Sequence, residues 1–466
     1  MQFIRPLLQR SPIILAAVLA ILLPRALHAE ARLVIEADSG KVLEAENATV
    51  PWYPASVTKL MTAYVTLQAV KDGKITLDTL FTVSPTAASQ SPSKMGFRPG
   101  TQVTVDNALK MMLVKSANDM AVVLAEGVGG SIDGFSVMMN QTAKKLGMTQ
   151  TSYVNPNGLP ADGQITSARD LAILARSIIK NLPEYEYFVH IPSIRYGRRI
   201  TQNFNRLIGR YPGADGFKTG FICASGYNLV ASATRDGRRL IAVVLGASSG
   251  TMRSVRAAQL LDRGFASNGL TWLRPSLGTV DQLAPIDASP PNLHDAVCSG
   301  KHHKPASDDD DSLVAGTAGG SASGDGSNAM FLASGLQAPL PKPSEWLAAA
   351  PAASEPIVVY TGPTRTGAAL IAAVAADSAN QNAGSKRHGK RAHIAAKKPD
   401  AAAEPKAADA STKQAKPAAV RHANAKPDAA AKPTATDASA AKPAKPKAAT
   451  KPKTTPKTSG ETKPAG

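Results

Sequence analysis

The C-terminal stretch of the chain limits where a folded domain can lie. Residues 381–466 consist mostly of alanine, lysine and proline. This composition cannot bury a hydrophobic core, so we predict a long disordered tail. From Ser385 to Gly466 the sequence has 19 Lys and Arg against 6 Asp and Glu, which accounts for +13 of the formal net charge of +18. The rest of the chain carries only about +5, an ordinary value for a soluble domain, so we expect no nucleic-acid partner.

The first residues are typical of an export signal. Arg5 and Arg10 precede an apolar run over residues 12–23, and small residues follow it. This pattern favours a secretory signal peptide over a membrane-spanning helix. We predict cleavage after Ala29, with cleavage after Ala31 and an uncleaved anchor as the alternatives. The protein is therefore expected in the periplasm or cell envelope, free or peripheral on the membrane or wall.

Between these ends, the hydrophobic pattern predicts one α/β domain over residues 30–270. A β-hairpin is expected at 33–45 around Asp38-Ser39-Gly40, and another at 227–246 around Asp236-Gly237. Helices are expected after Ser56 and over residues 105–115, 119–127, 136–146, 167–179 and 251–265. This order predicts an antiparallel sheet flanked by helices, with an inserted helical subdomain.

Downstream of residue 270 the sequence predicts less structure. Residues 271–355 contain prolines, glycines and an acidic run at 308–311, and we interpret them as linker. Residues 356–380 are expected to form a short strand and helix. His294, Cys298, His302 and His303 are residue types that bind metals, but they lie in the predicted linker. We therefore predict no metal site and no cofactor.

The segment Pro54 to Lys59 carries the first sign of catalytic chemistry. Ser56 and Lys59 are three residues apart, so on a helix they share one face. A lysine amine in that position can activate a serine nucleophile. It can accept the proton only when it is neutral, which burial and a neighbouring cation favour. A second Ser-x-x-Lys, Ser91 to Lys94, runs into Gly96 and is not expected to form a helix.

Two further motifs follow in order, Ser116-Ala117-Asn118 and Lys218-Thr219-Gly220. Such a set occurs in β-lactamases and penicillin-binding proteins. With additional stretches at 119–121, 155–159, 166–170 and 225–233, the chain resembles the D-alanyl-D-alanine carboxypeptidases, the low-molecular-weight penicillin-binding proteins, over about residues 30–266.

The resemblance implies a β-lactamase/transpeptidase-like fold and a role in cell wall biogenesis and cell shape. It also implies hydrolysis of the terminal D-Ala-D-Ala bond of peptidoglycan stem peptides through an acyl-enzyme. β-Lactam antibiotics are then expected as acylating inhibitors.

Three residues are predicted to carry the reaction itself, and a fourth is predicted to bind the substrate beside them. Ser56 is the expected acyl-ester nucleophile and Lys59 its general base. Ser116 would relay a proton between the leaving amine and a lysine. Asn118 would hydrogen-bond the peptide of the substrate.

The residues around Lys218 are predicted to hold the substrate. Lys218 would attract its terminal carboxylate and supply the cation near Lys59, and Thr219 would offer the carboxylate a hydroxyl. Gly220 would leave room for the substrate to lie as an added strand. The resemblance also implies that the backbone N–H groups of Ser56 and Phe221 form the oxyanion hole, and that Arg253 helps to bind the carboxylate.

Three other functions stay open at the level of sequence. A class A β-lactamase would share the motifs, but it needs a glutamate to activate the deacylating water, and no Glu-x-x-x-Asn segment lies between residues 116 and 218. A D,D-endopeptidase would use the same chemistry on cross-links. A non-catalytic protein could present the basic tail to an anionic envelope surface through salt-sensitive contacts, although the complete motif set argues against it.

The chain has two cysteines, Cys223 and Cys298. An even pair in an oxidising compartment permits one disulfide. Such a bond would tie the segment after the domain to the region of the predicted active site. Two free thiols are the alternative, because the sequence does not give the distance between them.

Overall fold

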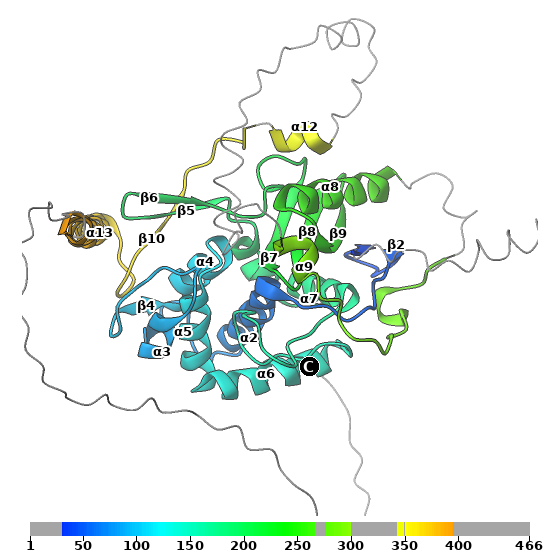
Figure 1. Cartoon of the computed structure of the whole chain (residues 1–466), viewed down its shortest axis with the longest axis horizontal. Helices are drawn as coiled ribbons and strands as arrows, with labels where there is room; N and C mark the ends of the chain where they lie inside the picture. Colours follow the sequence, from blue (N-terminus) through cyan, green and yellow to red (C-terminus); the bar gives the residue numbers. More distant parts are fainter. Residues whose placement is uncertain (1–29, 267–275, 300–342, 349, 395–466) are drawn as a thin grey trace, which may run out of the picture. The chain divides into compact units, whose positions relative to one another are not determined.

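The computed structural model describes residues 30–266, 276–299, 343–348 and 350–394 (Figure 1). The predicted signal peptide at 1–29 lies outside the described residues, as does the tail from residue 395. The prediction of disorder is wrong for residues 381–394, because they continue helix α13 (Gly367–Ile394). Its alanine-rich first turns favour this continuation, since propagating a helix is easier than starting one.

A five-stranded antiparallel sheet forms the centre of the fold. Its strands are β1 (Ala31–Glu36), β2 (Val42–Glu46), β7 (Ala214–Ile222), β8 (Gly226–Arg235) and β9 (Arg238–Ala247). Their spatial order is β2-β1-β9-β8-β7, and the two predicted hairpins are confirmed. Within this sheet, β7 pairs with β8 alone. Its outer edge therefore presents backbone groups that an added strand can pair with.

Side chains alternate between the two faces of the sheet, and helices cover both faces (Figure 1). Leu33 and Val243 point into the larger core, whereas Val34 and Val244 point into the smaller core under α8 (Gly250–Ala266). Five helices pack in the larger core: α2 (Lys59–Lys71), α4 (Val105–Val114), α5 (Asn118–Gly129), α6 (Ile132–Lys145) and α7 (Ala168–Asn181). All six helices lie where the sequence predicts them, and the fold class is confirmed.

Sequence periodicity does not identify several short elements. These are β3 (Leu80–Thr82), α3 (Pro85–Ser89), β4 (Gln102–Thr104), η2 (Pro183–Val189), β5 (Ser193–Tyr196) and β6 (Arg199–Gln202). They are too short to show a hydrophobic period, and most of them are placed by tertiary contacts. β10 (Ile357–Val359) adds to β5 in parallel, so a segment from the far end of the sequence completes a second sheet, β10-β5-β6.

Residues 276–299, which we call the strap, correct the interpretation of 271–355 as linker. The strap contains η4 (Val280–Gln282) and α9 (His294–Cys298), joined by an extended segment. Val280 is fully buried in the larger core, and the backbone of Val280 donates to Gly40 O at 2.8 Å. The strap therefore belongs to the folded domain. Its buried residues, Val280, Leu293 and Cys298, are too widely spaced to give a periodic pattern in the sequence.

Within the described ranges, no single helix is both long enough and apolar enough to cross a membrane. The pair α5 and α6 reaches that length and apolarity only when the two helices are taken together, and the pair is bent by 83°.

Candidate active site

The segment that precedes α2 presents Ser56 next to Lys59. Residues Ala55–Thr58 form a 3-10 turn, η1, and Lys59 is the first residue of α2. In a 3-10 turn, side chains three residues apart lie one above the other, which places both groups on one side of the turn. Ser56 is partly exposed, whereas Ala55, Val57 and Lys59 are buried. The hydroxyl can thus be reached from outside while its surroundings are fixed.

Lys59 has a solvent exposure of 0%, and its amine lies among three oxygen atoms. Nζ is 2.9 Å from Ser56 Oγ, 2.8 Å from Asn118 Oδ1 and 2.6 Å from Asn157 O. The amide and the carbonyl oxygens can only accept hydrogen bonds. In the structure, Nζ donates to all three oxygen atoms. Once Lys59 loses one proton, its two remaining N–H groups can stay on the amide and carbonyl oxygens, and its lone pair then faces the hydroxyl of Ser56.

The turn between α4 and α5 supplies the second motif. Ser116 has a positive φ of 60° and is 3% exposed, and Asn118 begins α5. Asn118 Nδ2 donates to Ser91 O at 2.9 Å, which fixes the amide so that Oδ1 faces Lys59. The structure thus brings Asn118 directly to the predicted base. The second Ser-x-x-Lys stretch is not a helix, as predicted, and forms part of the wall beside Asn118.

A buried carboxylate holds this wall in place. Asp119 accepts hydrogen bonds from Met95 N at 3.0 Å and from Gly96 N at 2.9 Å. Burial raises the pKa of Asp119 above its usual value, and the backbone N–H groups of Gly96 and Met95 oppose that rise. Asn118 N also donates to Ser93 O at 2.7 Å. The loop at 91–96 is therefore attached to the first two residues of α5, Asn118 and Asp119.

Sequence reasoning gave no role to the loop at residues 152–165, which forms another wall. Its Asn157 carbonyl binds Lys59, and Pro156 O accepts from Thr62 Oγ1 at 2.6 Å. Gly158 packs directly on the backbone of Ala55. The stretch 155–159 contributed to the family resemblance, which was the one signal that pointed to this loop, because a backbone acceptor has no sequence signature.

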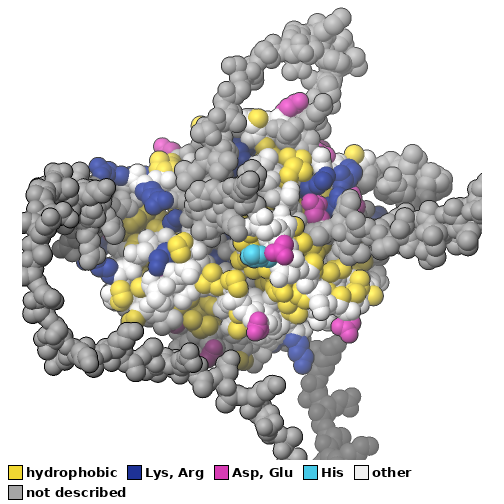
Figure 2. Space-filling view, in the orientation of Figure 1, with side chains coloured by type: hydrophobic (Ala, Val, Ile, Leu, Met, Phe, Trp, Pro, Cys, Tyr) yellow, Lys and Arg dark blue, Asp and Glu magenta, His cyan; other side chains and the backbone are white. Residues whose placement is uncertain are grey.

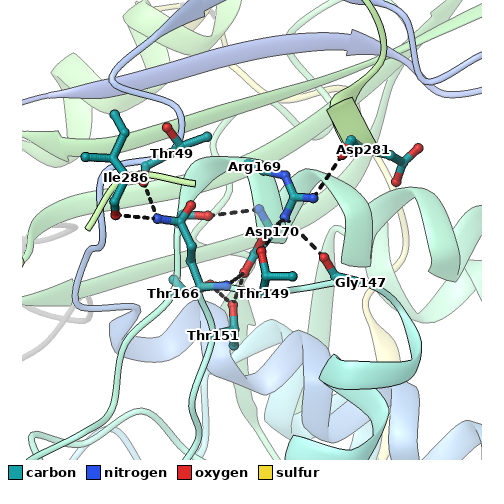
Figure 3. Close-up of polar contacts among 11 residues, drawn as sticks. Thr49, Gly147, Thr149, Thr151, Thr166, Arg169, Asp170, Asp281 and Ile286 are labelled. Atoms are coloured by element: carbon teal, nitrogen blue, oxygen red, sulfur yellow. Dashed lines mark hydrogen bonds and ion pairs between the residues drawn. The ribbon is translucent and has the colours of Figure 1, made fainter. Parts of the chain in front are cut away.

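Buried polar groups fix the base of this loop (Figure 3). Asp170 accepts from Gln150 N at 2.8 Å and from Thr151 Oγ1 at 2.7 Å, and pairs with Arg169 Nη1 at 2.7 Å. Burial raises the pKa of Asp170 although the hydrogen bonds and Arg169 act to lower it. Thr151 also lies 3.0 Å from the hydroxyl of Thr166 on the opposite side of the loop. Both ends of the loop are therefore held at one point.

Strand β7 carries the third motif on the open edge of the sheet. Lys218 and Thr219 are each 1% exposed, and Lys218 Nζ lies 5.9 Å from the centroid of the Phe204 ring. The structure gives a further reason for a glycine at position 220, beside the expected room for a substrate strand. A Cβ at Gly220 would lie 2.9 Å from Ser56 N and 3.0 Å from Pro54 O. The glycine thus lets β7 approach the nucleophile's own turn.

Arg253 on α8 braces β7 from behind. Its guanidinium Nη1 lies 3.5 Å from Gly220 O, and its Cζ is 5.5 Å from the centroid of the Tyr227 ring. The Tyr227 ring in turn lies 4.2 Å from that of Phe221. Arg253 therefore contacts the strand beside the nucleophile, and its predicted contact with a substrate carboxylate stays a prediction.

A cavity of about 280 Å³ lies beside η1. Its lining combines the residues before the nucleophile, the loop at 152–165 and the β7–β8 turn, namely Tyr53, Pro54, Ala55, Gly158, Leu159, Pro160, Ala161, Asp162, Gln164, Ile222 and Ala224. Most of these side chains are apolar, so the cavity suits an aliphatic group next to Ser56.

Of the two alternatives left open for the cysteines, the structure shows the disulfide. Cys223 in the β7–β8 turn is bonded to Cys298 of the strap, with a Cα–Cα distance of 5.7 Å. His302 and His303 lie outside the described residues. Within the described ranges, no group of three or more His, Cys, Asp or Glu is arranged to hold a metal ion.

Known proteins resemble this chain in sequence. A family model described as D-alanyl-D-alanine carboxypeptidase matches residues 20–249. The D-alanyl-D-alanine carboxypeptidase DacC of Escherichia coli (strain K12) is 42% identical over 245 residues, which cover 51% of this chain and 61% of DacC. DacB2 of Mycobacterium tuberculosis is 33% identical over 249 residues, which cover 52% of this chain and 83% of DacB2. The chain thus spans less than two thirds of DacC but most of DacB2.

Solved structures resemble the domain as well. The carboxypeptidase DacD from Francisella tularensis superposes with a TM-score of 0.51 and 33% identity, covering 52% of this chain and 71% of DacD. Penicillin binding protein 5 from Haemophilus influenzae superposes with a TM-score of 0.50 and 36% identity, covering 53% and 73%.

Proposed function

The chain belongs to the D-alanyl-D-alanine carboxypeptidase family, and from this membership we propose that it is a serine-type carboxypeptidase. Its substrates are peptidoglycan stem peptides ending in D-Ala-D-Ala, from which it removes the last D-Ala. The observation that carries this proposal is the 2.9 Å approach of the buried Lys59 amine to Ser56 Oγ. A nucleophile within hydrogen-bond distance of its base is the geometric requirement of covalent catalysis.

Acylation begins when Ser56 Oγ gives its proton to the neutral amine of Lys59 and attacks the carbonyl carbon of the penultimate D-Ala. The C–N bond to the last D-Ala then breaks. The leaving nitrogen takes up a proton. The proposed relay is the hydroxyl of Ser116, which passes this proton on from the protonated Lys59. The products of this step are free D-Ala and an ester between the peptide and Ser56.

The tetrahedral intermediate carries a negative oxygen that needs two N–H donors. The backbone N–H groups of Ser56 and Phe221 are the proposed pair. The close approach of Gly220 to Ser56 N supports this assignment, because it brings the backbone of β7 beside the nucleophile. Loss of one such donor typically slows turnover by about 10²–10³-fold.

Binding of the terminal carboxylate falls to Lys218 and Thr219, two and one residues before Gly220. Arg253 adds a second positive charge behind the strand, at the carbonyl of Gly220. For hydrolysis of the ester, water replaces D-Ala at the carbonyl carbon. Lys59 removes a proton from that water and returns it to Ser56 Oγ when the ester bond breaks.

Intact mass after brief exposure to penicillin tests the nucleophile. We expect a covalent adduct on the wild type, mapped to the peptide that contains Ser56, and none on Ser56→Ala. Penicillin suits this test because it acylates proteins of this class, and a related structure bears the name penicillin binding protein. Wild-type protein without an adduct would overturn the proposal.

Three substrates then separate the activities that share this chemistry. Release of D-Ala from a pentapeptide marks a carboxypeptidase, cleavage of a cross-linked peptide dimer marks an endopeptidase, and rapid turnover of penicillin marks a β-lactamase. We expect the first to be the fastest by more than about 10-fold, a free-energy difference of about 1.4 kcal/mol in the barrier. The proposal fails if either of the others dominates.

Export to the periplasm or cell envelope is part of the proposal, because the substrate lies there. The sequence pattern at 1–29 supports it. N-terminal sequencing of the protein recovered from the periplasm should begin at Glu30. A start at Arg32 would indicate the alternative site, and a chain that keeps Met1 would indicate an anchor.

We assign the basic tail to an anionic surface of the envelope. The residues from Ser385 onward carry +13 of the net charge, whereas charges of both signs are interspersed on the visible face of the described domain (Figure 2). Full-length protein should sediment with vesicles that contain phosphatidylglycerol, and a chain ending at Ile394, which keeps only four of the 19 Lys and Arg from Ser385 onward, should sediment far less. Because such binding is screened by salt, retention of the complex at about 1 M salt would contradict the assignment.

A further inference from the structure

The proposed function, on which this inference rests, gives the substrate a direction along β7. Its carboxylate is assigned to Lys218 and Thr219, and its scissile carbonyl to the N–H of Phe221. The next residues in that direction are Ile222, Cys223 and Ala224, which lead into the turn. Because an added strand runs alongside its neighbour, the residue that precedes D-Ala-D-Ala in the substrate extends toward this turn.

The cavity beside η1 lies at that end of the strand. Ile222 and Ala224 are part of its lining, together with Ala55, the neighbour of the nucleophile. Its volume of about 280 Å³ is near the lower limit for ligand pockets. That volume suits one peptide residue with an aliphatic side chain.

The inner part of the β7–β8 turn is attached to the segment before Ser56. Trp52 Nε1 donates to Ser225 O at 3.0 Å, and Asn228 Nδ2 donates to Tyr53 O at 3.0 Å. These bonds hold the end of the turn that enters β8. Residues Ile222 to Ala224 are more exposed than Ser225 and Gly226. Ile222 is bonded to Ser225 within the turn, through Ile222 N to Ser225 Oγ at 3.2 Å and Ser225 N to Ile222 O at 3.0 Å, whereas Cys223 and Ala224 are held from outside the turn.

The strap provides this support. Leu293 N donates to Ala224 O at 2.9 Å, and Cys298, which is 1% exposed, is bonded to Cys223. Upstream, the strap also reaches the base of the loop at 152–165. There Ile286 O accepts from Gln150 Nε2 at 2.9 Å, and Asp281 O accepts from Arg169 Nη2 at 3.2 Å (Figure 3). One segment is therefore attached to two of the three parts that line the cavity.

We propose that the Cys223–Cys298 disulfide is a positioning element that fixes the β7–β8 turn and thereby shapes the cavity for the substrate residue that precedes D-Ala-D-Ala. The bond does not touch the reacting atoms. Its effect reaches the substrate through Ile222 and Ala224. Reduction leaves Ser56, Lys59 and the carboxylate site in place and loosens only the part of the site that recognises the longer substrate.

Two substrates that differ in this one residue provide the test. Diacetyl-L-Lys-D-Ala-D-Ala places an aliphatic side chain in the cavity, and N-acetyl-D-Ala-D-Ala leaves it empty. In the full-length double variant Cys223→Ser/Cys298→Ser, we expect kcat/KM for the longer substrate to fall by about 10-fold, the size of effect typical of a lost pocket contact. The fall should appear mainly as a higher KM. For the short substrate, we expect a change of less than about 2-fold.

Reduction of the wild type is the matched experiment in case the double variant does not fold. Wild-type enzyme treated with a phosphine reductant, with both thiols counted by alkylation and mass, should show the same selective loss. The folded double variant should be insensitive to the reductant. Thermal unfolding of each sample checks that the domain is intact at the assay temperature.

The outcomes separate this inference from the proposed function. Equal losses for both substrates would indicate general destabilisation and overturn the inference, and so would no loss for either. If untreated wild-type enzyme cleaves neither substrate, the proposed function itself fails. Selective loss with the longer substrate, in both the variant and the reduced wild type, supports the positioning role.

Discussion

The contact between Gly158 and Ala55 makes Gly158→Ala a sharp test of how the nucleophile is positioned. A Cβ at residue 158 would lie 1.8 Å from Ala55 O and 3.0 Å from Thr58 Oγ1. Non-bonded carbon contacts have their optimum at about 3.5–4.0 Å, so the Ala55 carbonyl or the loop must move by more than about 1 Å. Ala55 directly precedes Ser56, and any such movement shifts the nucleophile.

Two costs add up in this substitution. Gly158 has a φ of 82°, and an alanine in that conformation costs roughly 1–2 kcal/mol. Overpacking against backbone adds about 1–3 kcal/mol. The free energy of unfolding should therefore fall by about 2–5 kcal/mol. A misplacement of about 1 Å at the reacting atoms can cost about 10²-fold in rate, so we expect a comparable loss in the rate of acylation by penicillin.

Gly163→Ala is the matched control in the same loop. Gly163 has a φ of 83°, but its Cβ would meet only Val154 Cγ2, at an ordinary 3.7 Å. Gly163→Ala should lower the free energy of unfolding by only the conformational cost of about 1–2 kcal/mol. Its acylation rate should stay close to that of the wild type. Urea unfolding and stopped-flow acylation with a fluorescent penicillin measure both quantities. If the two variants acylate at the same rate, the contact with Ala55 does not position Ser56.

Three further outcomes are expected. Reduction of Cys223–Cys298 opens a loop with a sequence separation of 75 residues, so chain entropy predicts a loss of about 4 kcal/mol in urea unfolding; unchanged stability would contradict that estimate. Arg169→Ala leaves the buried carboxylate of Asp170 without its ion pair and should cost about 3–5 kcal/mol in the same assay, whereas a loss typical of a surface pair would show that Asp170 is compensated by its other hydrogen bonds. Burial raises the pKa of Asp119 above 3.8, so between that value and its folded pKa the native state binds more protons than the unfolded state. Stability should therefore decrease as pH rises through this window and level off above it; the decrease should be smaller in Asp119→Asn, and an identical pH profile in the variant would exclude the contribution of Asp119.

The catalytic pair could be predicted because its spacing is local. Ser56 and Lys59 are three residues apart, so the local conformation of one turn is enough to bring them into contact. Helices α4, α5, α6, α7 and α8 were predictable for a similar reason, since each repeats its apolar face over several turns. Asn118 needed the family resemblance, because its contact with Lys59 joins residues 59 positions apart.

Other parts of the site depend on backbone groups and close packing, which sequence patterns do not record. The carbonyl of Asn157 binds Lys59, yet any residue would supply a carbonyl. The sequence predicted that position 220 must lack a side chain. It did not predict that a side chain there would clash with the backbone of the turn around Ser56. The strap is interpreted from sequence as linker because its three buried residues, Val280, Leu293 and Cys298, are too far apart to form a periodic pattern, and its other contacts are mostly single hydrogen bonds.

The disulfide also turns part of the domain into a covalent ring. Residues 223–298 include β8, β9 and α8, so two inner strands of the sheet and the helix that covers them lie inside the ring. A single cut by a protease between Cys223 and Cys298 therefore does not release a fragment. The N-terminal piece with Ser56 stays bonded to the C-terminal piece, and the two pieces separate on a gel only after reduction.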